Sequence, residues 1–325
     1  MSPKRGNSNT TVPLEKYIQQ AWNTPEVLNP FGITPSGASV DGSPVVPTLR
    51  KGCRNRIIYY IGSFNPPHLG HLALIDHVFS NTNAAVPSSS PPAPDDLNPV
   101  ALIVLLHGAS WVRGKLHKTP HSSSSDDEEP LHLSFAQRYR LVRQGVPDRL
   151  TRSGVWVFPE GLGDWWMFQN KLMTACRGDG FAVEFVELLG PDYVVQQRPQ
   201  CSGYHGVVTS NVCRKADFVP GAVHGDQLVR LEGFGPWGRS DVGGEVRDEE
   251  RMKSSVWVCE HDGRMGYRIW FVQHEAPIMD PGMSSTELRR IIADHKGKDL
   301  EERITGVAMS PELLIDSLET GREAG

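Results

Sequence analysis

Short apolar runs recur along the chain and are separated by amphipathic stretches. The first run, Ile57 to Ile61, has no charged position, which is typical of a strand buried on both faces of a sheet. Four later runs are also predominantly apolar. Together these runs predict strands over residues 57–61, 100–106, 155–158, 181–189 and 206–209.

Between the runs, apolar residues recur at the spacing of a helix. Leu69, Leu72 and Ile75 form one such stripe behind the first strand. Capping boxes mark two other helix starts, because a hydroxyl and a Gln or Glu three residues later satisfy free backbone N–H groups. These capping boxes start at Ser134 and Ser284. A third helix is predicted to begin after Asp164 and to end near Gly178, and a last one to begin at Ser310-Pro311.

Strands that alternate with helices in this way predict an α/β fold with a doubly wound parallel sheet. Residues 255–260 and 267–273 flank a turn and predict a hairpin at the far end of the chain. Because open parallel sheets bind ligands beyond the carboxyl ends of their strands, the loop after the first strand becomes the first place to search for a site.

Polar, proline-rich and glycine-rich segments interrupt this pattern. We expect residues 1–52 to form a partly disordered N-terminal extension with one short helix near Leu14, and residues 53–325 to form one domain. Within the domain, three stretches hold too few apolar residues to offset the entropy of ordering them. These predicted surface insertions lie near residues 84–99, 121–130 and 233–253.

The composition of the chain narrows the classes of protein to which it can belong. Its 325 residues carry a formal net charge of -5, and 38% are hydrophobic, which argues against a disordered chain, a membrane span and non-specific binding to nucleic acid. The five cysteines form no C-x-x-C pair, and no apolar stretch follows the basic start. We expect a cytoplasmic protein, with the nucleus as the alternative, and leave oligomerisation open.

The first candidate site is the segment GSFNPPHLGH, residues 62–71. Gly62 permits a sharp turn, and His68, Gly70 and His71 stand near the first turn of the following helix, where free N–H groups and the helix dipole favour an anion. Two imidazoles at this place can donate to phosphate oxygens. The alternatives are two incidental histidines in a connecting loop, or a zinc site that has no third ligand nearby in the sequence.

The second candidate site is the segment SSTELRR, residues 284–290, near the other end of the domain. Three hydroxyl groups at a helix start, followed by Arg289, make a second anion site. The alternative is that Ser284 and Glu287 only cap the helix while Arg289 is solvated. If both segments bind one triphosphate, they must meet in a single cleft.

The two motifs together resemble those of the nicotinamide/nicotinate mononucleotide adenylyltransferases, within the nucleotidyltransferases with a His-x-Gly-His signature. The resemblance covers most of residues 55–295 and implies a Rossmann-like nucleotidyltransferase fold. It implies that His71, His68 and Arg289 are catalytic. It implies an ATP site made of Gly62, Ser63, Phe64, His68, Gly70, His71, Gly190, Asp192, Ser284, Ser285, Thr286 and Arg289.

For the mononucleotide the resemblance implies Ser63, Phe64, Arg113, Lys115, Trp165, Trp166 and Arg214. The segment GASWVRGKL, in which Arg113 and Lys115 lie, departs from the family's paired lysines. One of the two tryptophans would stack on the pyridine ring, although a tryptophan at a helix start also suits the core. Mg²⁺ would be bound through the ATP phosphates, with no protein metal site.

The reaction implied is adenylyl transfer from ATP to nicotinamide or nicotinate mononucleotide, which forms NAD or its deamido form and pyrophosphate. Two alternatives stay open at this point. One is nucleotidyl transfer to another phosphorylated acceptor, and the other is a nucleotide-binding regulatory protein with little turnover.

Overall fold

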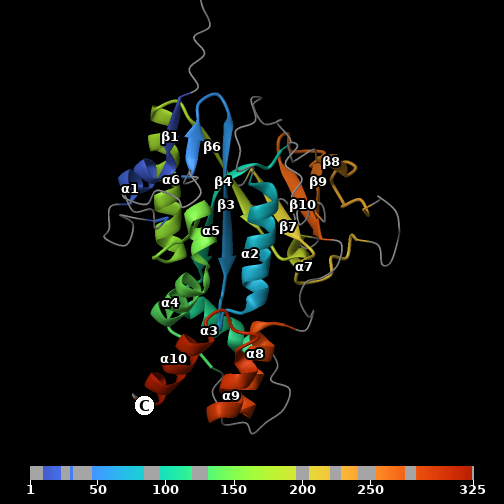
Figure 1. Ribbon diagram of the computed structural model, residues 1–325. Coiled ribbons are helices and arrows are strands. Elements are labelled where there is room, and N and C mark those ends of the chain that lie inside the picture. Colours follow the sequence, from blue (N-terminus) through green and yellow to red (C-terminus); the bar gives the residue numbers. More distant parts are fainter. Residues whose placement is uncertain are drawn as a thin grey trace, which may run out of the picture.

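The computed structural model describes residues 10–22, 30–31, 46–83, 96–118, 131–194, 205–219, 228–240, 254–274 and 283–323 (Figure 1). Within these residues, no helix combines the length and the apolar character needed to cross a bilayer. The predicted insertion at 121–130 and most of the one near 84–99 lie outside the described residues.

One sheet of eight strands organises the chain, in the order β5-β4-β3-β6-β7-β10-β9-β8. The six strands from β5 to β10 in this order are parallel, and β9 and β8 are antiparallel additions at one edge. The strands are β3 (Arg54–Gly62), β4 (Pro99–Leu106), β5 (Val155–Val157), β6 (Ala182–Leu188), β7 (Gly206–Ser210), β8 (Gly238–Ser240), β9 (Ser254–Glu260) and β10 (Arg268–His274).

Helices cover both faces of this sheet, which confirms the predicted doubly wound α/β fold. On one face α2 (Leu69–Thr82), α4 (Phe135–Gly145) and α5 (Asp148–Ser153) pack over Ile58, Leu102 and Val104. On the other, α1 (Leu14–Ala21) and α6 (Leu162–Gly178) pack over Ile57 and Tyr59. Successive residues of β3 thus enter opposite cores, which is why its sequence is apolar throughout.

A third group of helices lies below the lower end of the sheet in Figure 1, beyond the carboxyl end of β3. It comprises α3 (Ala109–Lys118), α8 (Ser285–Asp294), α9 (Gly297–Ile304) and α10 (Pro311–Glu323). Leu288 and Ile292 of α8 share a core with Leu300 of α9 and Leu141 of α4. This core holds α8 against the end of the sheet, where the second motif begins.

The N-terminal residues that the structure describes are part of the domain, in contrast to the predicted extension. The predicted short helix is present as α1, and its Leu14, Tyr17 and Ile18 are fully buried against α6. Tyr17 also donates a hydrogen bond of 2.7 Å to Asp179. β1 (Thr11–Pro13) pairs with β2 (Thr48–Arg50), so the described residues before position 52 pack together with those that follow it.

The predicted insertions also contribute to the fold where they are described. Leu97 is fully buried, and Pro99 begins β4. Phe234 is buried, and Gly238–Ser240 forms the edge strand β8. Four of the described helices were not predicted, α3, α5, α9 and the four-residue α7 (Pro191–Val194), because their apolar residues are few.

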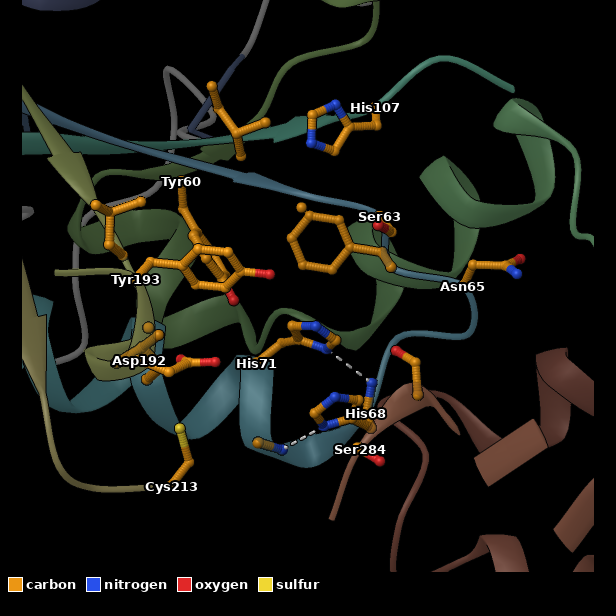
Figure 2. A pocket seen from close by; sticks show the side chains of 18 of the residues that line it. Tyr60, Ser63, Asn65, His68, His71, His107, Asp192, Tyr193, Cys213 and Ser284 are labelled. Carbon is orange, nitrogen blue, oxygen red and sulfur yellow. Dashed lines mark hydrogen bonds between the residues drawn. The ribbon is translucent and has the colours of Figure 1, made fainter. Parts of the chain in front are cut away.

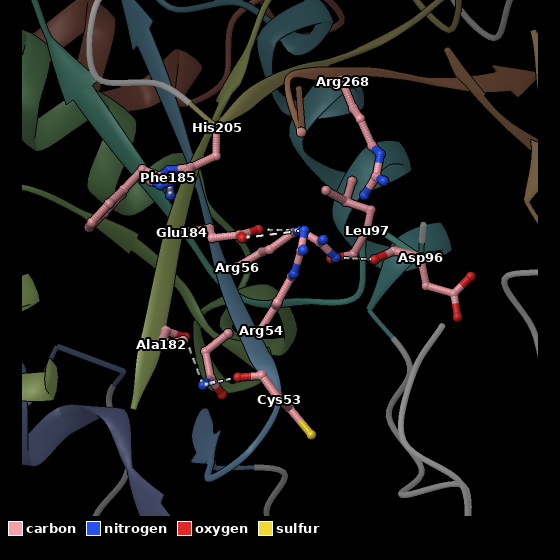
Figure 3. A network of polar contacts seen from close by, with 12 residues as sticks. Cys53, Arg54, Arg56, Asp96, Leu97, Ala182, Glu184, Phe185, His205 and Arg268 are labelled. Atoms are coloured by element: carbon pink, nitrogen blue, oxygen red, sulfur yellow. Dashed lines mark hydrogen bonds and ion pairs between the residues drawn. The ribbon is translucent and has the colours of Figure 1, made fainter. Parts of the chain in front are cut away.

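A buried polar network holds the amino ends of β3 and β6 in register (Figure 3). The Arg56 side chain, 3% exposed, donates to Glu184 over 3.0 Å and also to the carbonyl oxygen of Asp96. Asn55 donates to the carbonyl of Ala182 on β6. Because a slip of one residue would leave these buried groups unpaired, the network fixes the register of the two central strands.

Candidate active site

The central cleft lies where the order of the parallel strands reverses. β3 is the first parallel strand in sequence and β6 the fourth, and the two are neighbours, with β4 on one side and β7 on the other. Loops from such neighbours diverge to opposite sides and leave a crevice at the carboxyl ends. A cleft of about 470 Å³ occupies this place (Figure 2).

The first motif forms one wall of this cleft. His68 is the N-cap residue of α2, and its Nδ1 accepts the N–H of Gly70 over 3.2 Å. The Nδ1 of His71 accepts the N–H of His68, also over 3.2 Å, and the two ring centroids are 3.8 Å apart (Figure 2). A Cβ at Gly70 would lie 2.9 Å from the His68 ring, so a larger residue would displace this ring.

These contacts fix the protonation of both imidazoles. Burial lowers the pKa of His68 to about 4, and burial together with the neighbouring His68 holds the pKa of His71 well below its usual range. Both rings are therefore neutral at pH 7. Since each Nδ1 accepts a backbone N–H, each ring carries its proton on Nε2 and presents one uncharged donor.

Buried side chains inside and outside the motif shape the loop that precedes α2. The side chain of Arg138 on α4 is fully buried and donates to the carbonyl of Ser63 over 2.8 Å. Asn65 accepts the N–H of Leu133 and donates to the carbonyl of Leu131. Phe64 adopts a positive φ of 47° and lines the cleft. Contacts with Arg138, Leu131 and Leu133 thus hold the loop in place.

The second motif reaches the same loop. Ser285 donates to the carbonyl of Pro66 over 2.9 Å, although 219 residues separate them. Arg289 donates to the carbonyl of Asn65 over 2.7 Å and to the hydroxyl of Thr286 over 2.9 Å. Ser284 caps α8 as expected. Two segments from opposite ends of the domain therefore line one cleft.

Two further cationic side chains face this cleft beside Arg289. Lys115 on α3 lines it, and burial followed by the nearby Arg289 lowers the pKa of its ammonium group. Arg214, which follows β7, pairs with Asp192 of α7 (Pro191–Val194) over 2.5 Å. Three cations and two uncharged imidazoles around one cleft suit a ligand with several negative charges.

Most of the residues singled out in the sequence line this cleft, but three do not. Trp165 is fully buried among Tyr59, Phe158 and Phe168, so it is a core residue and the expectation that it stacks on a ligand is wrong. Trp166 and Arg113 are exposed and are not among the residues that line the cleft.

The cleft also contains residues that the sequence did not single out: Tyr60, His107, Trp111, Glu187, Tyr193 and Cys213. His107 stacks on Trp111 with centroids 3.6 Å apart and an angle of 12°. Two signals were available. His107 directly follows a predicted strand, as the first motif does, and Glu187 is a charged residue inside an apolar run.

The protein itself offers no metal cage in the part of the chain that the structure describes, where no group of three or more His, Cys, Asp or Glu residues is placed to hold an ion. The zinc alternative for His68 and His71 has no support here, because both Nδ1 atoms already accept backbone hydrogen bonds. A metal ion that enters with a triphosphate would need no such cage.

Comparison with known proteins gives a family match over the first part of the sheet. Residues 59–102 match the family model described as cytidylyltransferase-like. No curated protein is similar enough in sequence to be matched. The structure of the Plasmodium falciparum nicotinic acid mononucleotide adenylyltransferase complexed with NaAD aligns with a TM-score of 0.41 at 11% identity, over 81% of this chain and 95% of that one.

A second structure of that enzyme, complexed with APC, aligns with a TM-score of 0.42 at the same identity and coverage. The matched family segment runs from the end of β3 through the histidine motif and α2 into β4. Over the segment that carries its first motif, the chain is therefore similar to the cytidylyltransferase-like family, which confirms the resemblance to nucleotidyltransferases expected from the sequence.

Proposed function

We propose that this protein transfers the adenylyl group of ATP to the phosphate of nicotinamide or nicotinate mononucleotide. One observation carries the proposal: His68, His71, Ser285 and Arg289 line a single cleft at the point where the strand order reverses. Such a cleft, with helix N-termini on two sides, suits a polyphosphate.

The proposed reaction needs positioning and charge more than it needs a protein nucleophile. An oxygen of the mononucleotide phosphate attacks the α-phosphorus of ATP, the bond to the β-phosphate oxygen breaks, and pyrophosphate leaves. His71 and His68 donate from Nε2 to phosphate oxygens as charge builds up there. Arg289 and the hydroxyls of Ser285 and Thr286 bind the β- and γ-phosphates.

The acceptor would lie across the cleft from these groups. Lys115 and Arg214 supply the charge that an acceptor phosphate needs, which replaces the expected role of Arg113. Trp111, 48% exposed and stacked on His107, supplies the aromatic face that Trp165 and Trp166 do not. Mg²⁺, bound through the phosphates, would add further charge stabilisation.

A second candidate is transfer to a different phosphorylated acceptor. The cytidylyltransferase-like match over residues 59–102 favours it, since that family description names another nucleotide. The two candidates share the triphosphate site and differ only in the base and the acceptor.

A panel of substrates distinguishes them. The protein is incubated with Mg²⁺ and either ATP or CTP, and with nicotinamide mononucleotide, nicotinate mononucleotide or a phosphorylated alcohol, while chromatography follows the dinucleotide and a coupled assay follows pyrophosphate. A dinucleotide from ATP and a pyridine mononucleotide supports the proposal, and a product from CTP establishes the second candidate. ATP binding without any product would contradict both and favour a regulatory protein.

A further inference from the structure

A carboxyl group is buried in the wall of the cleft. Glu187 lies on β6, is 6% exposed, and is one of the residues that line the cleft. No described residue offers its Oε2 atom a hydrogen bond. Because proteins rarely leave a buried carboxylate oxygen unsatisfied, a group of this kind in a binding cleft points to a ligand.

Among the described residues, no hydrogen bond to its Oε2 atom gives this carboxyl group a structural task. Its neighbours in register are Tyr59 on β3 and Val207 on β7, and Phe185, two residues earlier on the same face, is in the apolar core. Burial raises the pKa of Glu187 to about 7. A leucine at this position would pack the sheet at lower cost, so the carboxyl group is better explained by recognition than by stability.

Glu187 lies at a suitable distance from the phosphate-binding loop. Glu187 is level with Tyr59 of β3 in the sheet, and Tyr59 comes three residues before Gly62. Because strands rise roughly 3.3 Å per residue, Glu187 and Gly62 are separated by about 10 Å along the sheet. That is the length scale of a nucleoside. A nucleotide whose phosphate lies at residues 62–71 can therefore place its base against Glu187.

We propose that Glu187 recognises a nucleotide base by accepting a hydrogen bond from an uncharged N–H donor of that base. A base that carries an oxygen or a carboxylate at the same place would bring two acceptors or two negative charges together, so Glu187 would reject it. The inference rests on the proposed function. Two groups have the required chemistry, the carboxamide of nicotinamide mononucleotide and the exocyclic amino group of ATP.

Two matched pairs of substrates distinguish these sources. Nicotinamide and nicotinate mononucleotide are compared with ATP as the donor, and ATP and inosine triphosphate are compared with nicotinamide mononucleotide as the acceptor. Both comparisons are made at pH 8 with the wild type, Glu187→Gln and Glu187→Leu. We expect the wild type to prefer the amino or amide member of one pair by at least about 10-fold in kcat/KM, and both variants to lose that preference.

Glu301→Gln is the matched control, because it removes the same charge from the exposed face of α9. It should keep the preference of the wild type, and thermal melting checks that every variant is folded. If the Glu187 variants lose the preference between nicotinamide and nicotinate mononucleotide, Glu187 contacts the acceptor base. If they lose the preference between ATP and inosine triphosphate, Glu187 contacts adenine. Unchanged ratios in both pairs would overturn the inference.

A separate measurement keeps this inference distinguishable from the proposed function. If no pair of substrates gives a product, the proposed function fails, and calorimetric binding of the same four nucleotides then tests Glu187 alone. Discrimination in affinity that disappears in Glu187→Leu supports the inference, and equal affinities in wild type and variant overturn it.

Discussion

Uncharged imidazoles at the centre of a cationic cleft have a clear electrostatic consequence. His68 and His71 lie beside Lys115, Arg214 and Arg289. A protonated imidazole at this place would be repelled by these cations and would also lose its hydration. Neutral rings add directed donors without adding charge. Their Nε2–H groups are positioned before substrate binds, so no reorganisation is needed as charge develops in the transition state.

We predict that His71→Ala lowers kcat by about 100- to 1,000-fold, since removal of one such donor costs roughly 3 kcal/mol of barrier. The protein should remain folded, because alanine preserves the helix. Steady-state kinetics measure the loss and circular dichroism checks the fold. His117→Ala, on the exposed face of α3 outside the cleft, is the control. A fully active His71→Ala would remove the phosphate role of this ring.

Among the elements, α8 has the most specific link to the site. Arg289 faces the first motif and donates to Asn65, whereas the adjacent Arg290 is exposed and pairs with Glu287 and Asp294 on its own helix. The two arginines thus have the same chemistry and opposite surroundings. They form a matched pair for testing whether the second motif does more than cap a helix.

Arg289→Ala should raise the KM for ATP by about 10-fold or more, because a charged donor to phosphate is lost. Arg290→Ala should leave the KM within about two-fold, since exposed pairs on one helix contribute little. Initial rates at varied ATP concentration provide the comparison. Equal effects of the two substitutions would show that Arg289 has no special role.

The packing of α1 makes a prediction about the N-terminal segment. Ile18 is fully buried against α6, whereas Gln20 on the same helix is exposed. Ile18→Ala should lower the free energy of unfolding by about 2–5 kcal/mol, and Gln20→Ala by less than about 0.5 kcal/mol. Urea unfolding measures both. A small effect of Ile18→Ala would mean that α1 is attached only loosely.

At the scale of the whole molecule, how much the sequence reveals depends on whether the signal is local. The five apolar runs correspond to strands of the sheet, because burial on both faces leaves a continuous apolar pattern. The position of β6 beside β3 could not be predicted, since it depends on register contacts such as Arg56 with Glu184. α3 was missed because Val112 and Leu116 alone mark its buried face.

The candidate site shows the same limit. Both motifs could be recognised, because each combines a helix start with characteristic polar residues. Trp165 was misassigned although Phe168, Leu172 and Cys176 continue its stripe at helical spacing, which is a local signal for the core. Arg138 could not be found, because its contact with Ser63 depends on how α4 packs beneath the loop.

The buried histidines predict how the stability of the whole molecule depends on pH. The pKa values of His68, His77 and His107 are each lowered to about 4, in every case mainly by burial. The unfolded chain therefore binds protons near pH 6.5 that the folded chain does not bind. Protonation below pH 6.5 therefore opposes folding: as the pH falls towards 4, the free energy of unfolding drops by on the order of 3 kcal/mol each for His68 and His77, and by less for the more exposed His107, because solvent screens its charge.

Urea unfolding between pH 7 and pH 4 should show this loss. Glu187 acts in the opposite direction, since its raised pKa favours the fold at lower pH, but three histidines outweigh one carboxyl group. His77→Gln tests the assignment away from the cleft, because His77 lies on α2 and packs against His274 of β10. It should reduce the pH dependence, and an unchanged slope would contradict the prediction.

The hydrogen bond between Ser285 and Pro66 has a consequence for the newly made protein. The ribosome synthesises the histidine loop early, and the serine that completes the cradle follows 219 residues later. A nascent chain therefore holds only half of its nucleotide site until α8 has left the exit tunnel. Any product of premature termination before residue 285 would retain the imidazoles and lack the groups that fasten the triphosphate.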